Sequence, residues 1–121
     1  MKPLFARINT VLAWVVFLGG VSLFYLIALS VFGGADASLH ARVGVILFLV
    51  SLVLGIAALI SRSSRLNLIL SISVPLLFFV QGLLVHLPPL PPAVRALHAL
   101  NGLAIMIICY LLANGRAKAT V

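Results

Sequence analysis

Four runs without a charged residue divide the chain. They cover residues 8–35, 43–61, 66–94 and 96–115, and Leu, Ile, Val, Phe and Ala dominate each of them. About 20 apolar residues in a helix, at ~1.5 Å rise per residue, cross the ~30 Å hydrocarbon core of a bilayer. Inside lipid a helix satisfies its own backbone hydrogen bonds, which an open strand cannot do. The pattern therefore predicts four membrane-spanning helices, at about residues 8–32, 39–61, 66–87 and 92–114.

The composition supports a membrane protein. A chain of 121 residues is ordinarily one domain, which here covers residues 1–121. Its residues are 64% hydrophobic and 7% charged, and its mean hydropathy is +1.36. Because a domain of this size leaves much of its surface exposed, that surface must face lipid. The connections are short, so the sequence predicts an all-α, up-down-up-down four-helix bundle in which the second and fourth helices are diagonal and parallel.

The net charge of +7 comes from eight Lys and Arg residues against the single acidic residue Asp36. Such a charge can indicate nucleic-acid binding, but here the cations gather at one set of helix ends. That set consists of Lys2, Arg7, Arg62, Arg65, Arg116 and Lys118, whereas only Arg42 and Arg95 fall at the other ends. The positive-inside rule then places both termini and the central connection in the cytoplasm. The predicted partner is the bilayer, including anionic lipid, and not nucleic acid.

A near-repeat marks the second and fourth helices. "LHARVG" occupies residues 39–44 and "LHALNG" occupies residues 97–102. The same shift along the chain aligns four pairs: His40 with His98, Gly44 with Gly102, Ser51 with Cys109, and Gly55 with Ala113. Small residues mark the packed face of a membrane helix, so we expect both histidines to face the bundle interior at one depth. The simplest origin of the repeat is a duplicated helical hairpin.

Two inward histidines on opposing helices suit a bis-histidine haem near the outer face. Gly44 and Gly102 lack Cβ atoms where the edge of a porphyrin would lie. Arg42 and Arg95 stand at the same level, and haem propionates would give them partners. The sequence therefore predicts a b-type haem with His40 and His98 as iron ligands, in electron transfer with a quinol or a periplasmic carrier.

Other interpretations of these residues remain open. The histidines can instead belong to a cofactor-free scaffold or accessory subunit that packs through its small residues, as a homo-oligomer or within a larger membrane complex. His86 and Gln81 near the end of the third helix can form a quinone or chlorophyll-type pocket, and His86 can replace His98 as a ligand. His86 can equally be an interfacial histidine beside the Pro-rich turn. Because Asp36 is the only acidic residue, neither a hydrolase nor a transporter is expected.

Several segments carry a resemblance to known proteins. They are Arg7 at the start of the first helix, "LHARVG", "FFVQGLL" in the third helix and "RALHALNGLAI" in the fourth. With them the chain resembles a family of small, uncharacterised bacterial four-helix membrane proteins, which implies the bacterial inner membrane. It is more distantly similar to half of a haem A synthase and to cytochrome b561-type bundles, which implies a ligand role for His40 and His98. It departs from two-haem cytochromes because no histidine lies near the cytoplasmic side, and this excludes electron transfer through two haems.

Overall fold

A computed structural model describes residues 2–87 and 89–115 of the chain. This part of the chain is helical and has no strand. Its four helices are α1 (Lys2–Val31), α2 (Ser38–Ser61), α3 (Arg65–His86) and α4 (Pro92–Ala113). Each is long and apolar enough to cross a membrane, which confirms the four predicted spans. Arg116 and Lys118, which contribute to the predicted charge bias, lie outside the described residues.

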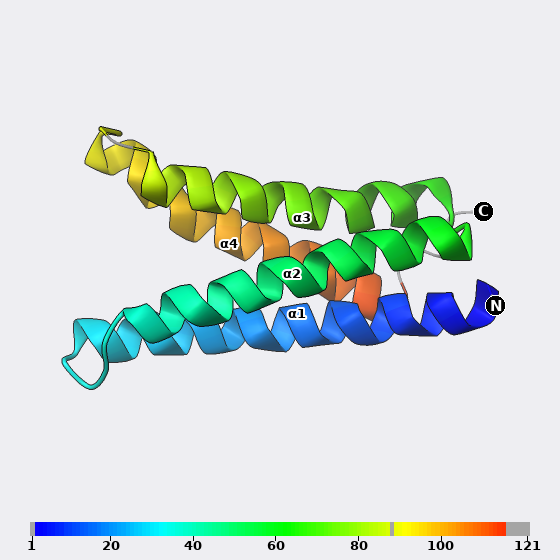
Figure 1. Cartoon of the computed structure of the whole chain (residues 1–121), viewed down its shortest axis with the longest axis horizontal. Coiled ribbons are helices and arrows are strands. Elements are labelled where there is room, and N and C mark those ends of the chain that lie inside the picture. The colour runs from blue at the N-terminus through cyan, green and yellow to red at the C-terminus, as the bar shows by residue number, and fades with distance from the viewer. Residues whose placement is uncertain (1, 88, 116–121) are drawn as a thin grey trace.

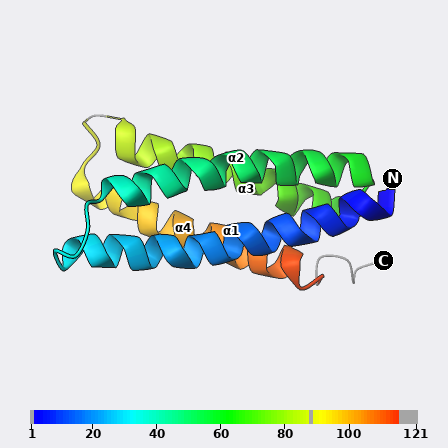
Figure 2. The same ribbon diagram turned by 60° about the horizontal axis from the view of Figure 1, so that its bottom comes forward.

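The helices form a bundle in which each one packs against two neighbours. α1 and α3 both pack against α2 and α4, so α1 faces α3, and α2 faces α4, across the centre. The N-terminus and the connection from α2 to α3 lie at one end of the bundle (Figure 1). The connection from α1 to α2 and the start of α4 lie at the other end, as Figure 2 also shows. Histidines at the starts of α2 and α4 are therefore brought to the same end.

The ends of α1 and α2 use the left-handed backbone conformation. After α1, Gly33 has φ of 79° and the N–H of Gly34 donates to the carbonyl of Leu29 at 2.8 Å. After α2, Arg62 takes the same role with φ of 50°, and the N–H of Ser63 donates to the carbonyl of Ala58 at 3.4 Å. Glycine adopts this conformation without the steric cost that a Cβ atom imposes. The Arg62 cap is therefore locally strained.

Replacing Arg62 with glycine is expected to stabilise the bundle by about 1 kcal/mol, because the strain of the left-handed residue is removed. Unfolding by a titration with sodium dodecyl sulfate measures the change. The matched control is Arg65→Gly, which removes the same charge from the first turn of α3 and is expected to destabilise the bundle. Equal effects of the two substitutions would contradict the assignment of strain to Arg62.

α3 continues through Pro75, which cannot donate to the carbonyl of Ser71 one turn earlier. This carbonyl faces α2 at a glycine: a Cβ atom built on Gly55 would lie 3.6 Å from the oxygen of Ser71. The small residue lets α2 approach closely enough to cover the unpaired carbonyl. The proline is thus accommodated by the neighbouring helix.

Buried positions recur along the chain at a spacing of 58 residues. This is the separation of Asn9 from Asn67, and it is also the separation of His40 from His98. Each buried residue of α1 has a buried counterpart in α3, and each buried residue of α4 has one in α2. The pairs are Asn9 with Asn67, Ala13 with Ser71, Val16 with Val74, Leu47 with Ile105, Ser51 with Cys109, Leu54 with Leu112, and Gly55 with Ala113. The pattern of buried positions in α1 therefore recurs in α3, although the amino acids at the corresponding positions are mostly different.

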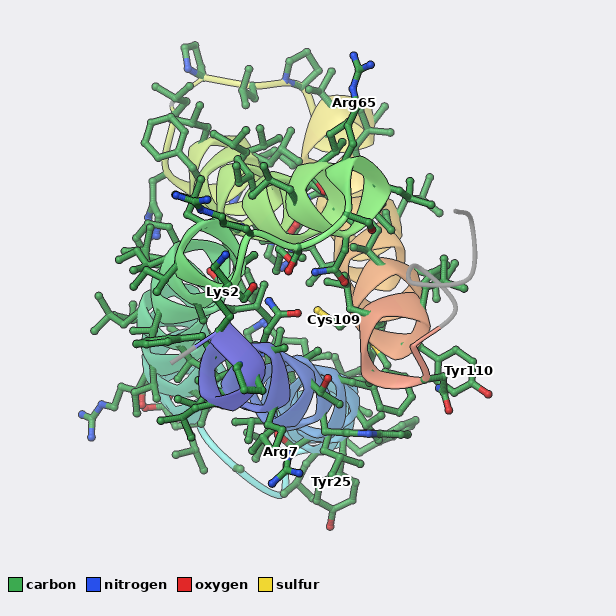
Figure 3. All side chains as sticks on the ribbon, turned by 90° about the vertical axis from the view of Figure 1, so that its right-hand side faces the viewer. Lys2, Arg7, Tyr25, Arg65, Cys109 and Tyr110 are labelled. Atoms are coloured by element: carbon green, nitrogen blue, oxygen red, sulfur yellow. The ribbon has the colours of Figure 1, made fainter. Side chains whose placement is uncertain are left out.

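The outer surface of the bundle is apolar. Large hydrophobic side chains such as Leu18, Val45, Leu76 and Leu103 are exposed on all four helices. In water such a surface would associate or aggregate, whereas in a bilayer it contacts lipid. The interior contains aliphatic side chains such as Leu54 and Leu112 together with small and polar residues. Figure 3, which looks onto the N-terminal end, shows the Cys109 sulfur pointing into the space between the helices.

Candidate functional site

His40 and His98 lie together at the end of the bundle away from the N-terminus. They come from α2 and α4, and their ring centroids are 6.1 Å apart with an angle of 52° between the ring planes. Both side chains are half-buried. The expected convergence of the two histidines at one depth is therefore present.

A backbone carbonyl holds each imidazole from the preceding helix. Nδ1 of His40 lies 3.0 Å from the carbonyl oxygen of Leu23, and Nδ1 of His98 lies 3.4 Å from that of Gln81. A carbonyl only accepts hydrogen bonds, so each Nδ1–H is the donor. The Nε2 atom of each neutral ring then has a free lone pair, which is the arrangement that supports metal ligation through Nε2.

Gln81 acts as a link between α3 and α4. Its Nε2 donates to the carbonyl of His98 at 2.9 Å, and its Oε1 accepts a hydrogen bond from Nδ2 of Asn101. Asn101 Nδ2 also contacts the carbonyl of Leu77 at 2.8 Å. Sequence reasoning placed Gln81 in a possible quinone pocket and did not single out Asn101. In the structure the Gln81 amide bonds to the backbone and side chain of α4, where it positions His98.

The substitution Asn101→Ala is expected to destabilise the bundle by about 1 kcal/mol, because it removes two hydrogen bonds to α3 and each such bond between membrane helices averages about 0.6 kcal/mol. Detergent unfolding measures the loss. Asn114→Ala is the control, because the exposed Asn114 amide donates only within its own helix, to Tyr110 at 2.9 Å. An Asn101 variant as stable as the Asn114 variant would show that the link between α3 and α4 contributes nothing.

The two predicted glycines differ in their surroundings. A Cβ atom on Gly44 would meet nothing within 4 Å, whereas one on Gly102 would lie 3.3 Å from Nε2 of Gln81 and 3.9 Å from Cζ of Phe24. Space beside the histidines is therefore open on the α2 side. On the α4 side the Gln81 side chain fills it.

The predicted arginines are exposed on the outside of this end. Arg42 follows His40 on α2, and Arg95 precedes His98 on α4. A cavity of about 330 Å³ is lined by Val85, Pro92, Arg95 and His98. The cavity thus places a cation next to one of the two imidazoles, where an anionic group could be held.

The chain's single acidic side chain is held close to the same end by its own turn. Asp36 is fully exposed, and the Ser38 hydroxyl and backbone N–H donate to its carboxylate and hold its pKa below the usual value. The carboxylate is therefore ionised at neutral pH. It is the one protein carboxylate side chain available to Arg42 and Arg95.

His86 does not join the pair. It is the last residue of α3 and is exposed. Its exposure at the end of α3 gives no support to a role in place of His98 as a ligand. The interpretation as an interfacial histidine agrees with its exposure.

A metal held by protein atoms alone would need a larger cluster. Among residues 2–87 and 89–115 no three His, Cys, Asp or Glu side chains are grouped so as to bind a metal ion. Zinc sites use three or four protein ligands, whereas a metal inside a macrocycle needs only one or two axial ones. His40 and His98 alone therefore fall short of the ligand set of a zinc site.

A polar cluster at the opposite end escaped the sequence analysis. The Asn9 and Asn67 side chains are 1% and 2% exposed and meet at the bundle centre, where Nδ2 of Asn67 donates to Oδ1 of Asn9 at 3.4 Å. Their spacing equals that of His40 and His98, and each interrupts an apolar run. That shared spacing was a signal in the sequence that could have identified them.

Comparisons of the chain with protein-family models, with curated proteins and with solved structures each found no match. They assign no family to it.

Proposed function

We propose that the chain is a multi-pass protein of the bacterial inner membrane that binds one b-type haem between His40 and His98. Its helices run up-down-up-down, with both termini in the cytoplasm and the histidines near the outer face. The charge distribution supports this orientation, since Lys2, Arg7, Arg62 and Arg65 belong to the end opposite the histidines. The haem exchanges electrons with a quinol or a periplasmic carrier.

The observation that carries the proposal is the separation of the two rings. With metal–nitrogen bonds of about 2 Å, as for zinc–imidazole, and each nitrogen about 1 Å from its ring centroid, two axial imidazoles have centroids roughly 6 Å apart. The centroids of His40 and His98 are 6.1 Å apart. The separation of the rings is that of two imidazoles bound to one metal.

Each residue near the pair has a role in this proposal. The carbonyls of Leu23 and Gln81 accept hydrogen bonds from Nδ1–H and keep the proton there, so that Nε2 is the nitrogen of each ring that would bind the iron. The open space at Gly44 on α2 would accept one edge of the macrocycle. On the side of Gly102 in α4, the Gln81 side chain would border the macrocycle. Arg42 and Arg95 pair with the propionates at the membrane surface. When bound, the haem supplies one-electron redox chemistry.

Expression of the full chain with haem supplied, followed by purification in detergent, tests the proposal. The expected product is coloured, with a Soret band and one haem per chain by extraction and quantification as the pyridine complex. A colourless protein that does not take up added haem would contradict the proposal.

A cofactor-free scaffold or accessory subunit is the second candidate. The hydrogen bonds from His40 to α1 and from His98 to α3 favour it, because they fasten both hairpins without any ligand. In that case both histidines are structural, and the purified chain is colourless. Histidine variants would then lose stability without any spectral change.

A further inference from the structure

The two hairpins, α1 with α2 and α3 with α4, diverge toward the histidine end of the bundle. Figure 1 shows α2 and α3 close together near the connection that joins them and further apart at the other end, where α2 begins and α3 ends. α1 and α4 diverge in the same direction. Whether side chains fill these widening interfaces depends on the residues at each level of the bundle.

The α1–α4 and α2–α3 interfaces correspond through the 58-residue spacing of the two hairpins. In the α1–α4 interface a Cβ atom built on Gly20 would lie 2.8 Å from Cγ of Met106. The corresponding residues of the α2–α3 interface are Phe78 and Phe48, whose ring centroids are 6.5 Å apart. Side chains therefore close both interfaces at this level.

One helical turn closer to the histidine end, the two interfaces differ. A Cβ atom built on Gly102 would lie 3.9 Å from Cζ of Phe24, so a phenyl ring of α1 reaches α4. The corresponding residues of α2 and α3 are Gly44 and Gly82, and a Cβ atom on either would meet nothing within 4 Å. Because residues four apart share one face of a helix, each of these glycines continues the face of the phenylalanine one turn deeper. An opening between α2 and α3 therefore lies at the level where Phe24 closes the other interface.

The α2–α3 opening, which is bordered by Gly44 and Gly82, adjoins the histidine pair. His40 precedes Gly44 by one turn of α2 and so lies on the same face of that helix. The residues that follow the two glycines are apolar and exposed, Val45 on α2 and Leu83 on α3. Such side chains contact the hydrocarbon of a bilayer. The opening therefore connects the histidine pair with the lipid.

We propose that the α2–α3 opening admits haem from the lipid and holds one edge of the macrocycle, and that Gly82 keeps this space free. The inference rests on the proposed haem site. A planar apolar ring of the chain itself, that of Phe24, fills the equivalent space between α1 and α4. The same kind of space between α2 and α3 therefore suits the planar, apolar edge of a macrocycle. Haem then enters the bundle from one side only, because Phe24 closes the other.

The substitution Gly82→Phe gives the α2–α3 interface the ring that Phe24 supplies between α1 and α4. The full-length apoprotein in lipid nanodiscs is titrated with haem, and the Soret band is recorded. The affinity is expected to be at least about tenfold weaker than that of the wild-type chain, because haem must force the added ring into its packed surroundings. Leu83→Phe adds a ring at the neighbouring exposed position and is expected to keep the wild-type affinity. An unchanged affinity in Gly82→Phe would overturn the proposal.

The double substitution of Gly82→Phe with Phe24→Ala moves the opening to the α1–α4 interface. The moved opening adjoins His98 as the original one adjoins His40, since the same spacing relates both pairs. The affinity for haem is therefore expected to return to within about threefold of the wild-type value. A double variant that binds haem as weakly as Gly82→Phe alone would contradict the assignment of the loss to a closed opening.

The stability of the haem-free protein tests the opening separately from haem. Gly82→Phe is expected to unfold at the same concentration of sodium dodecyl sulfate as the wild-type chain, because its ring enters open space. Gly102→Phe is expected to unfold at a lower concentration, because a Cβ atom there already lies 3.3 Å from Nε2 of Gln81. Equal losses in the two variants would show that no opening exists and would overturn the proposal.

The outcomes for the wild-type chain separate this inference from the proposed function. A wild-type chain that takes up no haem would overturn both of them. A wild-type chain that binds haem, beside a Gly82→Phe variant of equal affinity, would overturn only the role of the α2–α3 opening.

Discussion

Replacing His40 or His98 with alanine is expected to lower the affinity for haem by more than about 100-fold. Loss of a residue that only hydrogen-bonds to a metal ligand costs 10–100-fold in metal affinity, and in the proposed site each substitution removes a ligand itself. The variant chains should purify without the Soret band of the wild-type protein. Absorption spectra at equal protein concentration measure the loss, and added imidazole should partly restore the band by entering the vacated position.

His86→Ala is the matched control for these two variants. His86 is exposed at the end of α3, so its removal should leave the band and the haem content unchanged. A His98 variant with a full band beside a His86 variant without one would contradict the ligand assignment.

Asn9→Leu is expected to destabilise the bundle by about 2–3 kcal/mol, the largest effect on stability that we predict. The Asn9 amide connects three helices, through the carbonyl of Leu54, Oγ of Ser71 and Nδ2 of Asn67. Individual hydrogen bonds between membrane helices average about 0.6 kcal/mol, and the substitution also leaves buried partners unsatisfied. Unfolding by a titration with sodium dodecyl sulfate measures the difference from the wild-type protein.

Ser22→Ala provides the comparison for Asn9. The Ser22 hydroxyl is exposed and bonds within its own helix, to Gly19 at 2.6 Å, so its loss should change the stability by less than about 0.5 kcal/mol. An Asn9 variant as stable as the Ser22 variant would show that the central polar cluster does not hold the helices together.

The helices could be predicted from the sequence because hydrophobic length is a direct signal in a membrane protein. Three of the predicted ranges end within about one residue of α2, α3 and α4, which is the usual uncertainty of a helix boundary. The first differs more, since α1 begins at Lys2 and not near residue 8. The predicted helix began at the apolar run, which starts directly after Arg7. A helix can nevertheless continue through charged residues beyond the hydrocarbon core. A charged residue thus indicates where the hydrocarbon core of the membrane stops, and it does not indicate where the helix starts or ends.

The convergence of His40 and His98 could also be predicted, because the same motif at the same helix depth places both side chains in one layer. The hydrogen-bond partners of the two histidines could not be predicted from the sequence. A carbonyl such as that of Leu23 has no sequence signature, and the contact of Gln81 with Asn101 depends on the rotation of α3 against α4. The exposure of His86 could not be predicted either, since the exposure of a residue at a helix end depends on where that helix stops.

The correspondence of the two hairpins was only half visible in the sequence. Small residues repeat between α2 and α4, because close helix packing restricts the side chains there. In α1 and α3 the repeating property is burial: Val16 matches Val74, but Ala13 matches Ser71. Comparison of amino acids alone misses such a relation. We propose that a duplicated hairpin gave rise to both the histidine pair and the asparagine pair.

In the proposed site two histidine nitrogens of this chain bind one haem iron. Electron paramagnetic resonance of the oxidised, purified protein labelled with ¹⁵N-histidine tests it most directly, since the hyperfine couplings count the coordinated imidazoles. We expect a low-spin ferric signal with two labelled histidine nitrogens in the wild-type protein and in His86→Ala. His40→Ala and His98→Ala should each give a signal only after unlabelled imidazole is added, and then with one labelled nitrogen. A signal with one histidine or none in the wild-type protein, or a chain that binds no haem, would contradict it.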